Sequence, residues 1–381
     1  MEWKEVRLGD ILNFRRGHDL PHSAMKPGNI PVAGSNGVIG YHDTATPIKP
    51  ILTIGRSGNV GKPYFYEEAW AHNTTLYVDD FKGNDPKFLY YLCQTMPFAN
   101  FGGGSAVPTL NRNHIHPLET KIPVKVEDQR RIASILSSLD RKIELNNKIN
   151  ADLEEMAQAI FKNWFVDFEP FKDSKFVDSE LGMIPEGWKV GRLDEIADVV
   201  GGSTPSKAKP EYYTQKGIAW LTPKDLSNHP AVYTSRGEID ITEEGYNSTS
   251  TKLMPKGTIL FTSRAPIGYI SIAQNDICTN QGFKSLVPKK AGTCFLYCFL
   301  KYVTPEIENK STGSTFKEAS GSLMKSLQVL MPEQKVFEDF ETIVSPLFAR
   351  IESLEKESSR LSLLRDTLLP RLMSGELEVP E

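Results

Sequence analysis

Residues 50–65, PILTIGRSGNVGKPYF, combine glycines, an arginine and a lysine in a way that suggests phosphate chemistry. A phosphate-binding loop needs Gly, four residues, then Gly-Lys-Ser/Thr, because that spacing curls backbone N–H groups around a phosphate and places a hydroxyl on Mg²⁺. Here five residues separate Gly55 from Gly61, and Lys62 precedes a proline. The stretch therefore does not predict nucleotide binding. Its hydrophobic run, arginine and small-residue turn return in residues 259–270, ILFTSRAPIGYI, and this marks one copy of a repeat.

Arg56 and Arg264 occupy equivalent positions in the two copies, each directly after an expected strand. A guanidinium there could donate to guanine O6/N7 or to a phosphate, or it could form an ion pair that closes the turn. Several neighbours share this candidate role: Ser57, Asn59, Lys62, His72 and Asn73 in the first copy, and Gln281 and Lys284 in the second. For His72 and Asn73, hydrogen bonds that form a turn are the alternative.

Basic or Gly/Ser-rich loops supply the remaining candidates for contacts with phosphates or bases, although such loops are also common as plain solvated surface. They contain Arg15, Arg16, Ser105, Asn111 and Arg112 in the first half, and Lys207, Lys209, Lys224, Ser314, Thr315 and Lys317 in the second. His114 and His116 lack a third metal ligand, so we predict neither a metal site nor a cofactor. The four cysteines show no CxxC spacing, which predicts reduced, mostly buried thiols.

The elements that position these residues occur twice in the same order. WKEVRLGDIL (3–12) matches WKVGRLDEIA (188–197), and Arg16-Gly17 falls opposite Gly201-Gly202. Five further matched pairs follow, down to KIPVKVEDQRR (121–131) and SLQVLMPEQKV (326–336). Within each half, short Val/Ile/Leu/Thr/Phe runs separated by Gly, Pro and Asn predict a strand-rich domain. We therefore infer an internal duplication with pseudo-twofold symmetry.

A long helix is expected after each strand-rich half. Residues 127–162 contain no Pro or Gly, and apolar residues recur there at heptad spacing. In the second helix, residues 340, 347, 354, 361 and 368 are apolar at every seventh position. Two such stripes bury each other most simply as an antiparallel pair, in which Asn146, Asn150, Ser358 and Arg365 would fix the register. We expect Pro346 to kink the second helix and Pro370 to end it near Leu369.

The net charge of −4 conceals a modular distribution. Residues 1–125 carry 13 Lys+Arg and 11 Asp+Glu, and residues 185–332 carry 17 and 14, whereas residues 126–184 and 333–381 are acidic. The excess of positive charge thus falls on the strand-rich halves, where phosphate attraction would be needed. No apolar run approaches the roughly 18 residues of a membrane span, and the N-terminus lacks a signal-peptide core, so we expect a cytoplasmic protein.

Several motifs resemble the specificity subunit of type I restriction-modification systems, over the whole chain. They are AIFKNWFVDFEP (159–170), GMIPEGWKVGRLDEI (182–196), EDQRRIASILSSLDRKIELNNKI (127–149) and LLRDTLLPRLMSGELE (363–378). The resemblance implies an α+β fold in which two strand-rich target recognition domains, 1–126 and 185–332, are separated by two long antiparallel coiled-coil-like helices. The helices belong to segments 127–184, which includes a linker, and 333–381, which includes the tail.

The resemblance also implies that each recognition domain reads one half of a bipartite double-stranded DNA site. The helices would set the spacing and dock two methyltransferase subunits, through which restriction/motor subunits join. Phe161, Trp164, Phe165 and Phe168 could serve that interface or pack internally. No Asn-Pro-Pro-Tyr/Phe, GxGxxG, P-loop or HExxH motif occurs, so we expect no active site in this chain. The alternatives are a coiled-coil scaffold with duplicated protein- or glycan-binding domains, and a fragment of an enzyme with an unrecognised active site.

Overall fold

The structure, a computed structural model, describes residues 1–102, 109–264, 266–312 and 317–379. Its contacts divide the chain into two units, each described here by itself. The first unit contains Met1–Glu144 and Ser359–Glu381, and the second contains Leu145–Ser358. Among the described residues, no helix combines the length and the apolar character that a membrane span requires.

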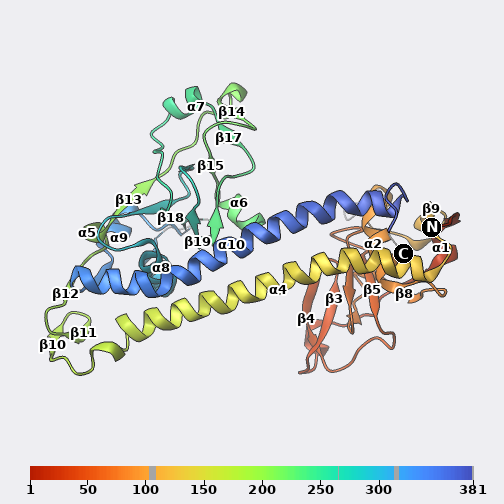
Figure 1. Cartoon of the computed structure of the whole chain (residues 1–381), viewed down its shortest axis with the longest axis horizontal. Helices are drawn as coiled ribbons and strands as arrows, with labels where there is room; N and C mark the ends of the chain where they lie inside the picture. Colours follow the sequence, from red (N-terminus) through yellow and green to blue (C-terminus); the bar gives the residue numbers. More distant parts are fainter. Residues whose placement is uncertain (103–108, 265, 313–316, 380–381) are drawn as a thin grey trace. The chain divides into compact units, whose positions relative to one another are not determined.

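The first unit is built on a four-stranded sheet of order β2-β8-β5-β6 (Figure 1). A smaller sheet, β4-β3-β7, and the antiparallel pair β1-β9 complete its strands. The elements are β1 Trp3–Arg7, α1 Leu8–Ile11, β2 Asn13–Arg16, η1 His22–Ala24, β3 Ile30–Gly34, β4 Gly37–His42, β5 Ile51–Gly55, β6 Pro63–Tyr66, β7 Trp70–Ala71, β8 Thr75–Asp80, α2 Pro86–Thr95, η2 Phe98–Phe101, α3 Arg112–Ile115 and β9 Glu119–Pro123.

The core of the first unit lies between this sheet and α2. The helix begins at Asp85, whose side chain accepts a hydrogen bond from the Phe88 N–H (2.8 Å). Pro86 suits the first position of the helix, because a backbone N–H there would have no partner within the helix. Its apolar face buries Phe88 and Tyr91 completely. The sheet face opposite contributes Phe14, which is also fully buried. Helix α2 thus covers one face of this sheet with its apolar side chains.

The second unit has a five-stranded sheet of order β13-β21-β18-β19-β16, with the strand pairs β12-β22, β15-β20, β14-β17 and β10-β11. Its elements are η3 Glu169–Phe171, β10 Phe176–Ser179, β11 Gly182–Pro185, β12 Lys189–Arg192, α5 Leu193–Ile196, β13 Ala197–Gly201, η4 Pro210–Tyr212, β14 Tyr213–Thr214, β15 Trp220–Leu221, α6 Pro223–Asn228, β16 Tyr233–Thr234, β17 Asp240–Ile241, α7 Glu243–Asn247, β18 Ile259–Ser263, β19 Ile267–Ala273, β20 Cys278–Thr279, β21 Lys284–Pro288, α8 Thr293–Lys310, α9 Gly321–Ser326 and β22 Gln328–Met331.

The two units repeat one topology, which confirms the duplication inferred from the sequence. The order β2-β8-β5-β6 in the first sheet corresponds to β13-β21-β18-β19 in the second. In each unit the strand before the first short α-helix pairs antiparallel with the last strand, β1 with β9 and β12 with β22. Each also has a short parallel pair, β3 with β7 and β15 with β20. The second unit adds β14, β17, α6, α7 and β16 to this plan.

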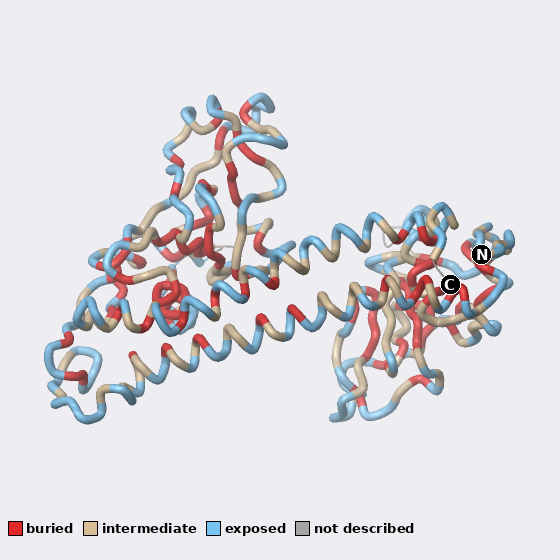
Figure 2. Tube along the Cα trace, in the orientation of Figure 1, coloured by how far each residue is buried: buried red, intermediate tan, exposed pale blue. Residues whose placement is uncertain are grey.

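Two helices of 40 residues, α4 Val126–Phe165 and α10 Gln334–Met373, confirm the long helices expected from the heptad pattern. In the second unit they are antiparallel, because Asn146 of α4 bonds to Ser358 (3.2 Å) and Phe161 lies against Phe340. In the first unit Asp140 accepts a hydrogen bond from Arg365 (2.8 Å). Three of the four polar residues predicted to fix the register, Asn146, Ser358 and Arg365, therefore contact polar partners across the pair, whereas the buried Asn150 Oδ1 has no hydrogen-bond partner among the described residues. Figure 2 shows buried residues recurring on both helices, except between Leu354 and Leu369 of α10, where none is buried.

Pro370 does not end the second helix, so that prediction is wrong. The helix continues to Met373, since Leu372 and Met373 are 1% and 5% exposed and pack into the core of the first unit. The helix is also continuous through Pro346. A proline removes one backbone donor, and burial of the last turn compensates for that loss. All four cysteines are unpaired and buried, as expected, and burial raises the pKa of each thiol.

Candidate nucleic-acid interface

Four arginines of the first unit line one surface depression of about 390 Å³. Arg15 and Arg16 come from the end of β2, Arg56 follows β5, and Arg112 is the first residue of α3. These segments are neighbours because β2 and β5 both pair with β8 and because the Leu110 N–H bonds to the Arg56 carbonyl (2.8 Å). Five of the candidate residues are thus brought together, since Asn111 also lines the depression.

Two carboxylates partly offset this positive charge. Asp79 lies 3.8 Å from Arg15, and Asp19 lies 3.4 Å from Arg16. Both arginines are exposed, so these ion pairs are weak and can be exchanged for other acceptors. Arg112 donates to the Phe14 carbonyl (3.2 Å), which orients its guanidinium. Such a cluster suits a polyanion or the acceptor atoms of base edges.

The turn after Arg56 shows why this stretch is not a phosphate-binding loop. It connects the antiparallel strands β5 and β6, and Gly61 closes it by donating to the Gly55 carbonyl (2.7 Å). A phosphate-binding loop leads into a helix, whose N-terminus helps to hold the phosphate. Within the turn, Ser57 is half-buried, whereas Asn59 and Lys62 are exposed.

His72 takes part in the turn between β7 and β8, which is the alternative that the sequence left open. Its Nδ1 lies 3.0 Å from the Thr74 hydroxyl, and its carbonyl accepts from the Thr75 hydroxyl (2.8 Å). Burial lowers the pKa of His72, so the neutral form is favoured. Asn73 donates to Asp19, and its carbonyl accepts a hydrogen bond from Arg56 (3.4 Å). This turn therefore supports the arginine cluster.

The second unit has a larger depression, of about 870 Å³, at whose edge the equivalent arginine lies. It brings together four candidates: Lys207, Lys224, Arg264 and Gln281. Thr204 donates to the Gln281 side chain, and this bond ties the basic loop after β13 to the turn after β20. Glu238 lies 3.5 Å from Lys224.

Arg264 forms the ion pair that the sequence offered as the alternative to a DNA contact. Its Nη1 lies 3.6 Å from Glu318 Oε2, and Lys284 Nζ lies 3.5 Å from Glu318 Oε1. Lys284 and Lys317 do not line the depression. Lys317 is exposed and donates to the Glu308 carbonyl (3.4 Å).

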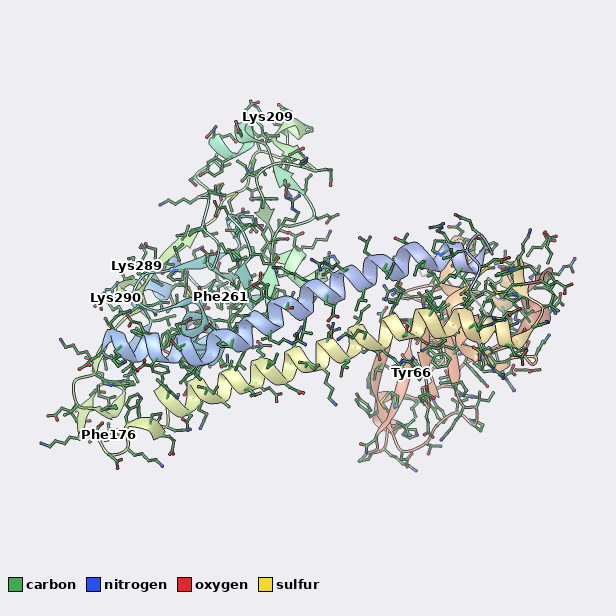
Figure 3. The ribbon with its side chains drawn as sticks, in the orientation of Figure 1. Tyr66, Phe176, Lys209, Phe261, Lys289 and Lys290 are labelled. Atoms are coloured by element: carbon green, nitrogen blue, oxygen red, sulfur yellow. The ribbon has the colours of Figure 1, made fainter. Side chains whose placement is uncertain are left out.

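Lys209, labelled in Figure 3, does not line the depression either, although its neighbours Lys207 and Pro210 do. It donates to the Tyr212 hydroxyl (2.8 Å) and packs over that ring, and the hydrogen bond to Tyr212 raises its pKa. Three further candidates, Ser105, Ser314 and Thr315, lie outside the described residues.

Comparison with known proteins identifies the family. The profile of the type I restriction modification DNA specificity domain matches residues 1–155 and 185–361. The chain belongs to this family.

Relatives of this specificity family cover the chain to different extents. The HindI specificity subunit of Haemophilus influenzae is 27% identical over 98% of this chain and 94% of its own length. The MjaIX specificity subunit of Methanocaldococcus jannaschii is 40% identical, but that match spans 50% of this chain and 44% of the relative. A crystal structure of the S subunit from M. genitalium shares the fold, with a TM-score of 0.63, 18% identity and coverage of 98% of this chain and 96% of that one. The expected fold class and family are confirmed.

The aromatic residues considered for a partner interface of this specificity chain divide into two pairs. Phe161 and Phe165 are 2% and 5% exposed and pack on Phe295 (5.5 and 4.9 Å between ring centroids). These two side chains therefore pack inside the second unit, which was the alternative to a partner interface. Trp164 and Phe168 are half-buried and keep some surface. Residues 161 and 165 lie one turn apart on α4 and share its face toward the domain, whereas Phe168 follows the end of that helix.

Sequence reasoning missed several residues of the two depressions, namely Thr109 in the first and Thr204, Trp220, Thr222 and Asn280 in the second. One signal was present, because the repeat places Asn280 opposite the candidate Asn73. Trp220 gave no such signal, since it is 4% exposed and its indole N–H donates to the Ser203 carbonyl (3.1 Å). Among the described residues, no group of three or more His, Cys, Asp or Glu side chains could hold a metal ion.

Proposed function

We propose that this chain recognises a bipartite sequence on double-stranded DNA, each strand-rich domain reading one half of the site. The domains are residues 1–126 and 185–332. The observation that carries the proposal is an arginine at the same place in both domains: Arg56 directly follows β5, and Arg264 directly follows β18. Each arginine lines a depression to which further cations contribute. Duplicated readers in one chain are the counterpart of a DNA-binding dimer on two half-sites.

Candidate contacts fall into two groups by their surroundings. Exposed cations, such as Arg15, Arg16, Lys62 and Lys207, suit phosphates, whose attraction is independent of sequence. The half-buried Arg56 and Arg264, with Asn111 and Gln281 nearby, suit base edges. Asn59, Asn73, Ser57, Lys209, Lys224, Lys317 and the residues outside the described range are further contacts under this proposal.

The chain would act without an active site of its own. We propose that the long helices set the distance between the half-sites and dock two methyltransferase subunits, to which restriction/motor subunits add. The half-buried Trp164 and Phe168 and the exposed Leu145 and Met156 of α4 are suitable contacts for such partners.

The test is to co-express the chain with the adenine methyltransferase encoded beside it, in a host without other adenine methylation, and to map modified bases by single-molecule sequencing. One split motif with a constant unspecified gap, absent without this chain, is the expected result. An assembled, cofactor-loaded complex that methylates nothing would contradict the proposal. Binding of DNA without sequence preference and with little salt dependence would instead indicate a scaffold.

A further inference from the structure

One carboxylate in the second unit forms ion pairs with two candidate DNA-binding cations at once, so that the three side chains keep a net charge of +1. Glu318 directs Oε2 toward Arg264 (3.6 Å) and Oε1 toward Lys284 (3.5 Å). The side chains of Arg264 and Glu318 remain 37% and 40% exposed. Solvent reaches this ion pair, so it is weak enough to be broken when another group replaces either partner.

The backbone holds Glu318 firmly in this position. Its N–H donates to the Thr312 carbonyl (2.9 Å), and residues 264 and 318 form a β-bridge. The next residue, Ala319, donates to the Ser263 carbonyl at the end of β18 (2.9 Å). The carboxylate is therefore built into the edge of the depression beside Arg264, rather than reaching it from a distant loop.

The first unit has a threonine where the second has this glutamate. Thr109 bridges to Ser57, next to Arg56, as Glu318 bridges to Arg264. Two residues later, Asn111 caps α3 and Ser320 caps α9, which supports the same alignment.

The two arginines consequently have different electrostatic surroundings. Within the described part of the chain, Arg56 has no carboxylate within 4.0 Å, and its guanidinium donates to the Asn73 carbonyl. Asp19 and Asp79 act on Arg16 and Arg15 instead. The first unit thus presents an arginine without a carboxylate partner among the described residues, whereas the arginine of the second unit already shares the Glu318 carboxylate with Lys284.

We propose that Glu318 is a specificity-determining residue of the second unit, an inference that rests on the proposed DNA recognition. Its carboxylate pairs with Arg264 and Lys284 until a duplex supplies acceptors that replace it, and it repels phosphates of a duplex in the wrong register. Repulsive elements of this kind are a general means of discrimination, because they penalise the wrong partner more than the right one.

The test compares the full-length chain with its Glu318→Gln variant by fluorescence anisotropy. The probes are the duplex defined by methylation mapping and a duplex with both half-sites scrambled, at several salt concentrations. We expect the variant to bind the scrambled duplex about three- to tenfold more tightly at low salt, with a slope of log K against log salt that is steeper by about one, as for one added phosphate contact. Affinity for the mapped duplex should change less, so the ratio between the two falls.

Two variants serve as controls. Glu306→Gln removes the same charge from α8, where Glu306 pairs with Lys310 (2.6 Å) and does not line the depression, and we expect it to bind both duplexes as the wild type does. Thr109→Glu places the carboxylate in the first unit beside Arg56. We expect it to weaken binding of the scrambled duplex, and this result would support the inference even if Glu318→Gln failed to fold.

The outcomes separate the two proposals. A wild-type chain that binds both duplexes equally would refute sequence recognition itself. A wild-type chain that prefers the mapped duplex, with Glu318→Gln unchanged in affinity and salt slope, would refute only the role of Glu318. A variant that loses affinity mainly for the mapped duplex would also overturn it, because Glu318 would then read a base directly.

Discussion

Arg56 shows how a single residue can be placed by the fold without being neutralised by it. Its N–H donates to the Thr74 carbonyl (2.8 Å) and its carbonyl accepts from Leu110, so its backbone is held on both sides. Its guanidinium, by contrast, has only the Asn73 carbonyl as a partner among the described contacts. A side chain held in this way can bind an external acceptor at little cost in conformational entropy.

We expect Arg56→Ala to weaken binding to a duplex that carries the intact first half-site by about 1–3 kcal/mol, as is typical for loss of an arginine contact to a base. Arg264→Ala should affect the second half-site and, because Glu318 already pairs with Arg264, should cost less. Anisotropy with duplexes altered in one half-site measures both effects. Arg141→Ala, at an exposed position of α4 outside the depression, is the matched control. If either variant lost the same affinity for the duplex altered in the first half-site and for the one altered in the second, the assignment of one domain to each half-site would be contradicted.

Glu355 on α10 gives the second unit a pH-dependent stability. Its carboxylate accepts hydrogen bonds from the N–H groups of Val232 (2.7 Å) and Tyr233 (3.0 Å). Its pKa is raised to about 7, chiefly by burial; the two backbone donors oppose this shift, and the nearby Glu154 and Glu352 add to it. Between the ordinary carboxyl pKa and pH 7, the folded chain therefore holds a proton that the unfolded chain releases.

That proton stabilises the fold at low pH, and its contribution is lost as the pH rises through about 7. We expect the free energy of unfolding to fall by about 1–3 kcal/mol from this group between about pH 5 and pH 8. Urea unfolding of Glu355→Gln should show a smaller change over the same range. Glu338→Gln, at an exposed position of the same helix, should keep the wild-type dependence. Parallel pH profiles for Glu355→Gln and the wild type would rule out this group as the cause.

At the scale of elements, the repeat is held by close approaches that only glycine permits. A Cβ on Gly17, after β2, would lie 2.1 Å from the His72 carbonyl oxygen. A Cβ on Gly202, after β13, would lie 2.1 Å from that of Thr279. Each glycine thus packs against the backbone at the end of a strand of the parallel pair, β7 in the first unit and β20 in the second. The turn that follows this strand carries candidate residues. The same chain crossing is thus preserved in the two units.

Gly202→Ala should therefore destabilise the second unit by about 1–3 kcal/mol or more, because the clash is with backbone that cannot rotate away. Gly201→Ala is the control one residue earlier, where a Cβ would meet nothing nearer than Lys284 Cδ at 4.0 Å. We expect the control to stay within about 0.5 kcal/mol of the wild type. Thermal unfolding followed by circular dichroism distinguishes the two. Equal melting temperatures would show that the crossing can relax.

At the scale of the whole molecule, the long helices connect two copies of one reader. Their pairing is polar at Asn146, which is fully buried and donates to Glu357 (2.9 Å) and Ser358 (3.2 Å). A buried polar pair inside an apolar stripe favours one register over its neighbours, since a shift would leave the amide without a partner. Under the proposed function, we expect this register to set the length of helix between the two halves of the chain.

We expect deletion of seven residues from α4 around Asn146 and seven from α10 around Ser358 to shorten the gap in the methylated motif. Seven residues correspond to about 10 Å of helix, or about three base pairs, and the removal turns the helix face by only about 20°. Single-molecule sequencing of the methylated host reads the gap directly. Removal of five residues from each helix, which rotates the face by about 140°, should abolish methylation. An unchanged gap after the heptad deletion would contradict the spacing role.

The sequence by itself determined the duplication, the fold class, the two long helices and the family, because these depend on patterns that extend over many residues. Heptad spacing predicted α4 and α10, and repeated strand and glycine positions predicted two equivalent sheets. The interruptions of the apolar stripe at Asn146 and Ser358 also predicted two register residues, which are joined by a hydrogen bond in the structure.

Only the tertiary structure decided which candidate side chains meet and which are already paired. Arg15 and Arg112 are far apart in sequence but line one depression, because strand pairing brings β2 and the segment before α3 to the same place. Glu318 gave no signal in the sequence, yet it forms an ion pair with Arg264. The extent of helix α10 beyond Pro370 was likewise decided by burial of Leu372. Such contacts join residues that are remote in the chain, and local pattern carries no information about them.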